Sequence, residues 1–453
     1  MSDLHFSKVL LDDGWSNDVL LSVRDGSIAA IATGAPAPAS ATKMRGVALP
    51  GMPNVHSHAF QRAMAGLTEV HGPKDDNFWT WREVMYGFLA QMTPDDIEAV
   101  AALAYVEMLE AGFTTVGEFH YVHNAPDGAR YADPAETAAR IVAAAAATGI
   151  GLTLLSCFYA HGGCGGQAPN PGQVRFVSDL DGFAALMEAS SAHIGRLPGA
   201  RLGIAPHSLR AVAADELPAL VHSYAAGPIH LHAAEQVREV EECLAWSGKR
   251  PVQWLLENVQ LDQRWCLIHC THMTSQEVAG LARSGAVAGL CPMTESNLAD
   301  GIFAGVEYEG AGGRFAVGTD SNVRISLNEE LRTLEYSQRL RDRKRNRFGA
   351  GRSSTGRSMF EAARKGGAQA LALGKAGLSV GQSADIVVLD DADPSLIGRD
   401  GDALLDAWIF AAGNVVRDVF VRGLHVVADR RHVQRDAVNR RYAATLRRLL
   451  QQV

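Results

Sequence analysis

The residues of this chain best suited to chemistry begin with two histidines one residue apart, His56 and His58. They follow the apolar run Val47–Pro50, which predicts a strand, and side chains two residues apart on a strand point to the same side. Two imidazoles held in this way can bind one metal ion. Because an isolated His-x-His pair is equally compatible with a structural role, its meaning depends on the rest of the chain.

Further side chains that can bind a metal follow apolar, strand-like runs, and they are His207, His232, His269 and Asp320. A single histidine at a strand end is more often a buried hydrogen-bonding residue than a ligand. Repetition at successive strands favours a shared site, and histidine nitrogens with a carboxylate suit a divalent ion such as zinc. We therefore predict one metal ion per chain, with the ligands His56, His58, His232 and Asp320.

The elements that must position these residues are strands that alternate with helical patterns, as in a parallel α/β sheet. Eight strand candidates end near His58, Tyr121, Tyr159, His207, Ala233, Cys270, Cys291 and Asp320. Helical patterns separate most of them, such as 95–111, 134–147, 235–246 and 275–284. This α/β pattern predicts a (β/α)8 TIM barrel over residues 49–375, with its chemistry at the carboxyl ends of the strands. His230 is expected to fill the barrel interior.

Both ends of the chain differ from the middle in their predicted secondary structure. They contain short strands and turns, such as 19–23, 27–31, 384–389 and 415–427. Because these patterns flank the long middle, they predict a small β-sandwich domain built from residues 1–48 and 376–453, with a C-terminal helix.

The composition excludes several classes of protein. A formal charge of −8 gives no basic field for nucleic acid. The six cysteines have no zinc-knuckle spacing and no disulfide framework, so we expect a reducing compartment. The N-terminus lacks the pattern of a signal peptide, and the uncharged stretch 141–160 is better explained by a helix end, a turn and a strand than by a membrane span. These features predict a soluble, cytoplasmic protein.

These motifs carry a family resemblance. The ordered set of histidines and an aspartate resembles the amidohydrolase superfamily, and His232-Ala233-Ala234-Glu235 resembles the His-x-x-Glu signature of its mononuclear deaminase branch. The chain has no lysine between Lys74 and Lys249, which excludes the carboxylated-lysine bridge of binuclear relatives. Longer stretches are similar to the N-formimino-L-glutamate deiminase family, namely 51–62, 78–82, 205–212 and 291–298.

The resemblance implies zinc-dependent hydrolysis of N-formimino-L-glutamate to N-formyl-L-glutamate and ammonia, a step of histidine degradation. In such a reaction a zinc ion acidifies a water for attack on the formimino carbon. Glu235 is then expected to move protons beside the metal, with His269 and Asp320 orienting the water and accepting its proton.

A substrate with two carboxylates needs cationic anchors, and a guanidinium can grip a carboxylate with two hydrogen bonds. The resemblance assigns substrate binding to residues that would otherwise be read as surface or packing residues: Gln61, Arg82, Tyr121, His207 and Arg210. The aromatic residues of segment 60–94 are compatible with a lid over the site and equally with packing on the barrel rim.

Two other functions remain open at this level. One is a purine or pterin aminohydrolase of the same branch, which would need a pocket for a flat heterocycle. The other is a scaffold that kept the fold without activity, which the complete ligand set disfavours. Iron or manganese can occupy the same ligands as zinc. A homodimer is expected because barrels of this type commonly self-associate.

Overall fold

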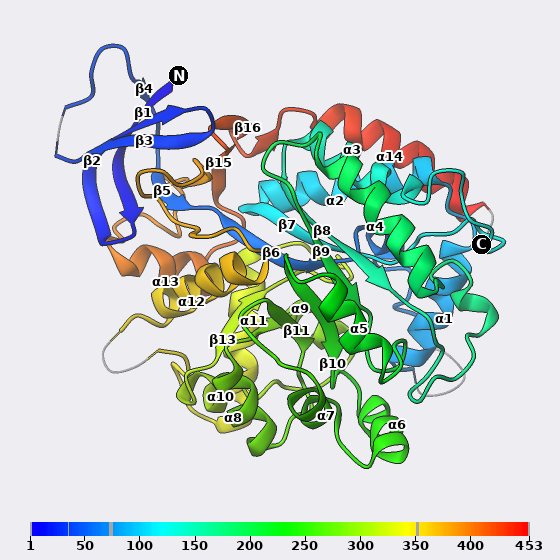
Figure 1. Cartoon of the computed structure of the whole chain (residues 1–453). Helices are drawn as coiled ribbons and strands as arrows, with labels where there is room; N and C mark the ends of the chain where they lie inside the picture. Colours follow the sequence, from blue (N-terminus) through cyan, green and yellow to red (C-terminus); the bar gives the residue numbers. More distant parts are fainter. Residues whose placement is uncertain (1, 35, 72–75, 350–352, 452–453) are drawn as a thin grey trace.

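The computed structural model describes residues 2–34, 36–71, 76–349 and 353–451. Its centre is an eight-stranded parallel sheet, which Figure 1 shows surrounded by helices. The strands follow each other in chain order: β6 (Met52–Ser57), β7 (Phe113–His120), β8 (Gly151–Phe158), β9 (Arg201–Pro206), β10 (Ile229–Ala233), β11 (Trp265–His269), β12 (Val287–Leu290) and β13 (Arg314–Val317). These strands match the eight predicted from the sequence, so the barrel prediction is confirmed.

The barrel closes between its first and last strands. The amide of Asp320 donates a hydrogen bond to the carbonyl of His56 at 2.9 Å, and the amide of His58 donates to the carbonyl of Asp320 at 2.9 Å. Gly318 allows this approach, because a Cβ there would lie 2.8 Å from the backbone of His56. Closure therefore brings the first and last predicted ligand segments into contact.

The helices that pack around the barrel begin and end at recognisable signals. Thr93 caps α2 through a reciprocal hydrogen-bond pair with Asp96, and Gly149 ends α3 in a left-handed conformation. The remaining helices of this layer are α4 (Leu180–Ile194), α5 (Glu216–Ser223), α6 (Val237–Ser247), α7 (Pro251–Asn258), α8 (Ser275–Ser284), α9 (Pro292–Asn297), α10 (Gly305–Gly310), α11 (Leu327–Asp342) and α12 (Thr355–Ala370), beside α2 (Pro94–Glu110) and α3 (Glu136–Thr148).

Strands from both chain ends form a second, nine-stranded mixed sheet beside the barrel (Figure 1). We call it the terminal sheet; it contains β1 (Ser2–Leu11), β2 (Gly14–Arg24), β3 (Ser27–Ala32), β4 (Thr42–Lys43), β5 (Val47–Pro50), β14 (Ile386–Leu389), β15 (Val416–Val421), β16 (Leu424–Ala428) and β17 (Arg431–His432). It has its own buried cluster, which includes Phe6, Val19 and Ile386. The predicted β-rich unit from both termini is confirmed; its exact residue boundaries stay a prediction.

The structure corrects one local interpretation. The run Val47–Pro50 is a strand, but it pairs with β1 and β14 of the terminal sheet and not with the barrel. The strand that carries His56 is β6, which begins only at Met52. Gly51 separates the two, and a Cβ there would lie 2.2 Å from the Thr114 hydroxyl. One apolar run in the sequence is thus divided between two sheets.

The last two helices, α13 (Asp402–Phe410) and α14 (Arg435–Leu450), follow strands of the terminal sheet. Helix α14 nevertheless packs along α2 of the barrel, where Arg435 pairs with Glu110 at 3.0 Å (Figure 1). His230 is fully buried and its Nε2 contacts the Ala370 carbonyl at 2.8 Å, as expected for a residue that fills the barrel. Over the described ranges, we find no helix with the length and apolar character needed to cross a bilayer.

Candidate active site

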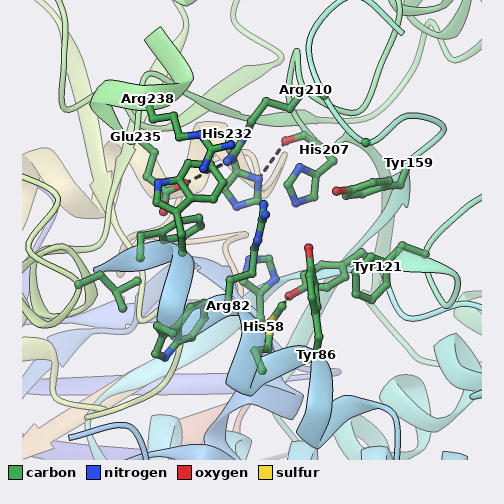
Figure 2. A pocket seen from close by; sticks show the side chains of 18 of the residues that line it. His58, Arg82, Tyr86, Tyr121, Tyr159, His207, Arg210, His232, Glu235 and Arg238 are labelled. Carbon is green, nitrogen blue, oxygen red and sulfur yellow. Dashed lines mark hydrogen bonds and ion pairs between the residues drawn. The ribbon is translucent and has the colours of Figure 1, made fainter. Parts of the chain in front are cut away.

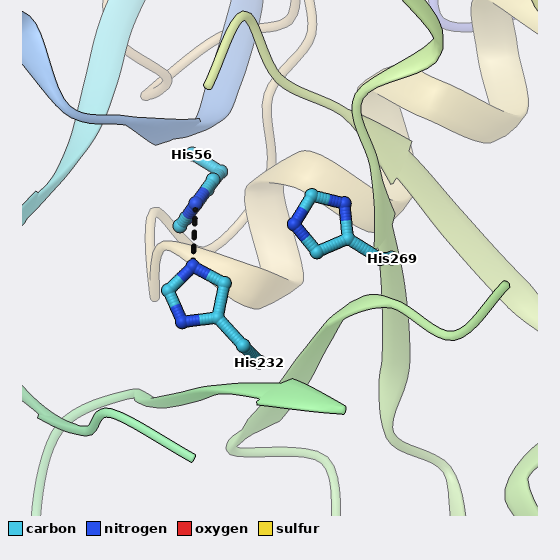
Figure 3. A group of neighbouring side chains, drawn as sticks. All are labelled: His56, His232 and His269. Carbon is cyan, nitrogen blue, oxygen red and sulfur yellow. Dashed lines mark hydrogen bonds between the residues drawn. The ribbon is translucent and has the colours of Figure 1, made fainter. Parts of the chain in front are cut away.

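The four predicted metal ligands come together at the carboxyl ends of three barrel strands. We call His56, His58, His232 and Asp320 the donor cluster. All four are buried, with exposed fractions of 5% or less. Asp320 Oδ1 lies 3.3 Å from His56 Nε2 and 3.5 Å from His58 Nε2, and the Nε2 atoms of His56 and His232 are 3.1 Å apart. Figure 3 shows the last pair beside His269.

These separations suit a metal ion. Tetrahedral zinc with bonds of about 2.0–2.1 Å has ligand atoms about 3.4 Å apart. Two of the three rings are also held with Nε2 inward, because His58 Nδ1 donates to the Phe119 carbonyl at 2.8 Å and His232 Nδ1 to the His207 carbonyl at 2.9 Å. Such outer hydrogen bonds orient imidazole ligands in metal sites. The ligand atoms of His56, His58 and Asp320 all lie within 4.8 Å of one another, and His232 adjoins this group through His56. The donor set therefore fits a divalent ion.

The protonation states of the donor cluster also suit metal binding. Burial and the neighbouring His58 lower the pKa of His56 to about 3, and burial with nearby histidines lowers the pKa of His232 well below its usual range. Burial opposes ionisation of Asp320, but contact with His56 holds the pKa of this carboxyl below its usual range. Neutral imidazoles and an ionised carboxylate are the forms that bind metal.

The backbone is strained at this mouth. Asp320 has a φ of 44° and His269 a φ of 70°, both in the left-handed region, as are Ala234 and Cys270 directly after their strands. A non-glycine residue in such a conformation costs about 1–3 kcal/mol and is typical of functional sites. The surrounding backbone contacts maintain this geometry and aim the side chains into the barrel mouth.

His269 differs from the donor cluster. Its Nδ1 lies 3.3 Å from Glu295, and its Nε2 lies 3.7 Å from Glu235 and 3.9 Å from Asp320. Burial opposes its charge, but Glu235 and Glu295 raise its pKa to about 10. It lies within ligand distance of His56 and His232, but its charged form suits proton handling better than metal binding.

One pocket opens over the donor cluster (Figure 2). Every predicted catalytic and substrate-binding residue lines it, whereas His56 lies beneath its floor. The predicted residues on its wall are His58, Gln61, Arg82, Tyr121, His207, Arg210, His232, Glu235, His269 and Asp320. Sequence positions separated by more than 250 residues thus share one cavity.

Three arginines gather around the indole of Trp79 on one side of the pocket, and we call Arg82, Arg210 and Arg238 the arginine wall. Their guanidinium carbons lie 4.5, 5.8 and 4.4 Å from the centre of that ring, respectively. Arg82 and Trp79 come from α1 (Phe78–Leu89), Arg210 from the turn after β9 and Arg238 from α6. Stacking on an aromatic face orients a guanidinium without neutralising it.

Two members of the arginine wall are available for an anion. The Nε atoms of Arg82 and Arg210 are buried and have no hydrogen-bond partner among the described residues. Arg210 lies 3.5 Å from Glu235, whereas Arg238 is paired with Glu242 at 2.7 Å on the exposed side of α6. The anion-binding capacity therefore lies with Arg82 and Arg210.

The other predicted substrate-binding residues line the same pocket, apart from the arginine wall. Gln61, in the short helix η1 (Ala59–Met64), donates to the Tyr121 hydroxyl at 2.9 Å, and its carbonyl oxygen is buried without a partner in the described part of the chain. The Tyr121 ring packs edge-on against His58. His207 contacts Tyr159 and His232. Residues 72–75 of the segment 60–94 lie outside the described residues, and whether that segment acts as a lid stays a prediction.

Sequence reasoning missed several buried carboxylates that support the site. Glu295, in α9, accepts from the Cys291 amide at 2.8 Å and holds His269. Glu239 accepts from the amides of Ala234 and Glu235 and so fixes the turn after β10. Glu235 lies in this turn, before α6, rather than in the helix itself as the sequence suggested. The signal for Glu295 was present, since it belongs to the motif-like stretch 291–298.

Comparisons with known proteins agree with this geometry. The amidohydrolase family profile matches residues 47–426. A formimidoylglutamate deiminase of Pseudomonas aeruginosa is 50% identical over 99% of this chain and 100% of its own length. A 5-methylthioadenosine/S-adenosylhomocysteine deaminase of Natronomonas pharaonis is 28% identical over 95% of this chain and 94% of its own. The crystal structure of an amidohydrolase from Brucella melitensis is 50% identical, covers 99% of this chain and 100% of its own, and superposes with a TM-score of 0.96.

Proposed function

The chain belongs to the amidohydrolase family, and from this premise we propose that it hydrolyses N-formimino-L-glutamate to N-formyl-L-glutamate and ammonia, in histidine degradation. The observation that carries the proposal is the presence of the donor cluster and of the free guanidinium atoms of Arg82 and Arg210 in one pocket. The donor cluster serves the reacting formimino group, and the two guanidinium groups serve the two carboxylates of the substrate.

We propose one divalent metal ion per chain, held by the donor cluster, with zinc preferred over iron or manganese. Support comes from the ligand separations and from the neutral state of the imidazoles. When bound, such an ion supplies a water whose pKa falls from about 16 to about 7, and so a nucleophile at neutral pH.

The proton transfers fall to three side chains at the same mouth. Asp320 accepts a proton from the attacking water through the carboxylate oxygen that faces His269, which holds that water in line. Burial raises the pKa of Glu235 above its usual range, which favours a carboxyl group that can hold and give a proton. Glu235 gives a proton to the imino nitrogen as the C–O bond forms. When the C–N bond breaks, the same nitrogen takes the proton that Asp320 accepted from the water, and Glu235 takes the proton of the hydroxyl group on the reacting carbon. Ammonia then leaves, and both carboxyl groups return to their starting forms.

The opposite end of the substrate is anchored by charge. Arg82 and Arg210 bind the two carboxylates, and the unpaired carbonyl oxygen of Gln61 accepts a hydrogen bond from a substrate N–H. His207 is neutral, since burial and the charge of Arg210 lower its pKa well below the usual range. It can therefore donate one hydrogen bond to the oxygen that forms at the reacting carbon without adding a charge.

A purine-type aminohydrolase is the alternative, and the 28% identity to a 5-methylthioadenosine/S-adenosylhomocysteine deaminase favours its consideration. A flat heterocycle would use the aromatic faces of Phe78 and Trp79. It would leave the buried Nε atoms of Arg82 and Arg210 without a hydrogen-bond acceptor, which is costly. A scaffold without activity would leave the strained mouth unexplained.

The test is release of ammonia by metal-replete protein from N-formimino-L-glutamate, guanine, adenosine and 5-methylthioadenosine, with metal analysis of the same sample. We expect turnover of the first substrate only, about one equivalent of zinc per chain, and loss of activity after chelation that added zinc restores. Turnover of a purine in place of N-formimino-L-glutamate would refute the assignment. A cytoplasmic homodimer is part of the proposal, and sedimentation of the purified protein tests the dimer.

A further inference from the structure

A second cavity lies at the opposite end of the barrel from the active-site pocket. Its lining comes from the amino ends of four barrel strands, β6 to β9, and from segments that lead into the terminal sheet. It therefore lies where the barrel meets the unit built from both chain termini, and no residue of the candidate active site contributes to it.

The charged residues of this cavity do not balance. Arg201 at the start of β9, Arg422 in the turn after β15 and Lys375 in the link towards β14 are cationic. The one carboxylate among the lining residues is Asp385, which leaves an excess of two positive charges from three cations and one anion. Hydroxyl groups of Thr114, Thr115 and Ser383 add neutral hydrogen-bonding capacity.

Local contacts hold the two arginines in place. Arg201 donates to the Gly199 carbonyl at 3.0 Å. Arg422 packs its guanidinium against the same glycine, where a Cβ would lie 2.7 Å from Nη1. Gly199 has a φ of 77°, so both its conformation and its missing side chain permit this approach. Two guanidinium groups thus converge on one glycine.

The one carboxylate offsets part of this charge, but in the described part of the chain it forms no ion pair with either guanidinium. Asp385 accepts a hydrogen bond from the Arg422 amide at 2.7 Å. Within the described ranges, the Arg422 guanidinium itself forms no hydrogen bond or ion pair. Burial and the charge of Arg422 lower the pKa of Arg201, whereas the charge of Asp385 opposes this shift. Like charges held together in this way are stabilised by an anion between them.

We propose that this cavity binds a small oxyanion with two negative charges, either phosphate or a dicarboxylate, across the contact between the barrel and the terminal sheet. The two planar guanidinium groups provide paired donors, the hydroxyls provide further donors, and Lys375 at the exposed rim attracts the anion. Because the ligand contacts both units, its binding stabilises the folded chain.

Calorimetric titration of the metal-replete full chain with inorganic phosphate, at low ionic strength, tests the site, with sodium chloride as the ionic-strength control. Succinate, a dicarboxylate without an ammonium group, distinguishes a dicarboxylate from phosphate as the preferred ligand in a parallel titration. We expect saturable binding of at least one of the two oxyanions. Arg201→Met and Arg422→Met each remove one guanidinium, and we expect each to weaken binding at least about tenfold. Asp385→Asn removes the opposing charge, keeps an acceptor for the Arg422 amide, and is expected to tighten binding.

Two controls separate this site from the rest of the molecule. Arg345→Met removes an exposed arginine elsewhere and is expected to leave binding unchanged. Arg82→Met removes an arginine of the active-site pocket and is likewise expected to leave the anion isotherm at the second cavity intact. Ammonia release by Arg201→Met and Arg422→Met, at the wild-type rate, confirms that these variants are folded.

Three results would overturn the proposal. The first is no binding of either oxyanion beyond the chloride control. The second is binding that Arg82→Met abolishes while Arg201→Met and Arg422→Met retain it, since the anion would then occupy the active site. The third is weaker rather than tighter binding in Asp385→Asn, which decides the question even where an arginine variant fails to fold.

Discussion

The donor cluster and the arginine wall share one pocket, but they are built in different ways. The donor cluster stands on barrel strands or in the turns that follow them, and the rings of His58 and His232 are fixed through Nδ1 by the carbonyls of Phe119 and His207. The arginine wall stands on α1, on α6 and in a turn, and long side chains reach the pocket by stacking on Trp79.

This difference indicates that the donor cluster serves the chemical step, whereas the arginine wall serves substrate binding. Short side chains on a closed barrel have little freedom, so they can be held for the bonds that change in the transition state. Long side chains on a helix or in a turn can adjust to a substrate and are suited to binding. We therefore expect changes in the donor cluster to act on kcat and changes in the arginine wall to act mainly on KM.

The largest effect that this comparison predicts comes from Asp320→Asn. The amide cannot carry the charge that the metal ion requires and cannot accept a proton, so we expect kcat to fall by about 10³-fold or more and zinc content to drop. Rate measurement and metal analysis of one sample check this. Asp300→Asn is the matched control, because burial raises the pKa of Asp300 to about 9 and so favours its neutral form. Full zinc content in Asp320→Asn would contradict the assignment of Asp320 as a metal ligand and with it the proposed role of the donor cluster.

Glu235→Gln tests the proton donor apart from the metal ion. Glutamine keeps the shape but cannot give a proton, so we expect kcat to fall by about 10²–10³-fold, with KM and zinc content unchanged. Glu242→Gln, at the pocket rim beside Arg238, is the control and is expected to change kcat less than about threefold. If zinc content falls with Glu235→Gln, the residue supports the metal and is not a proton donor.

Arg82→Met should move KM instead. Loss of a charge-assisted contact to a substrate carboxylate costs about 2 kcal/mol, which corresponds to a rise in KM of about 30-fold with kcat nearly unchanged. Steady-state kinetics with N-formimino-L-glutamate check it. Arg238→Met, in the same arginine wall but exposed and paired with Glu242, is expected to have less than about a threefold effect. Unchanged kinetics of Arg82→Met would remove it from the set of substrate anchors.

The two regions also differed in how far the sequence could predict them. Histidine spacing and strand periodicity located the donor cluster, because both are local patterns that a barrel brings together at one mouth. Trp79, the centre of the arginine wall, has no local pattern that distinguishes it from a packing residue. The sequence also did not predict that Val47–Pro50 and Met52–Ser57 belong to different sheets. Pairing with β14, which is distant in the chain, decides that the first of these strands joins the terminal sheet. The local pattern of apolar residues predicts that a strand forms, but it does not reveal which distant strand it pairs with.

Glu295→Gln gives the smallest effect and sharpens the boundary of the donor cluster. Glu295 touches His269 but lines no part of the pocket, so it acts through that ring. The amide still accepts from the Cys291 amide, so the fold is kept, but the negative charge that raises the pKa of His269 is lost. We expect kcat to fall about tenfold and the alkaline limb of the pH–rate profile to move to lower pH, because His269 then loses its proton more easily. Glu309→Gln, a half-buried carboxylate on α10 that accepts from Gly349, is the matched control. An equal loss of kcat without a shift of the profile would mean that Glu295 only supports packing.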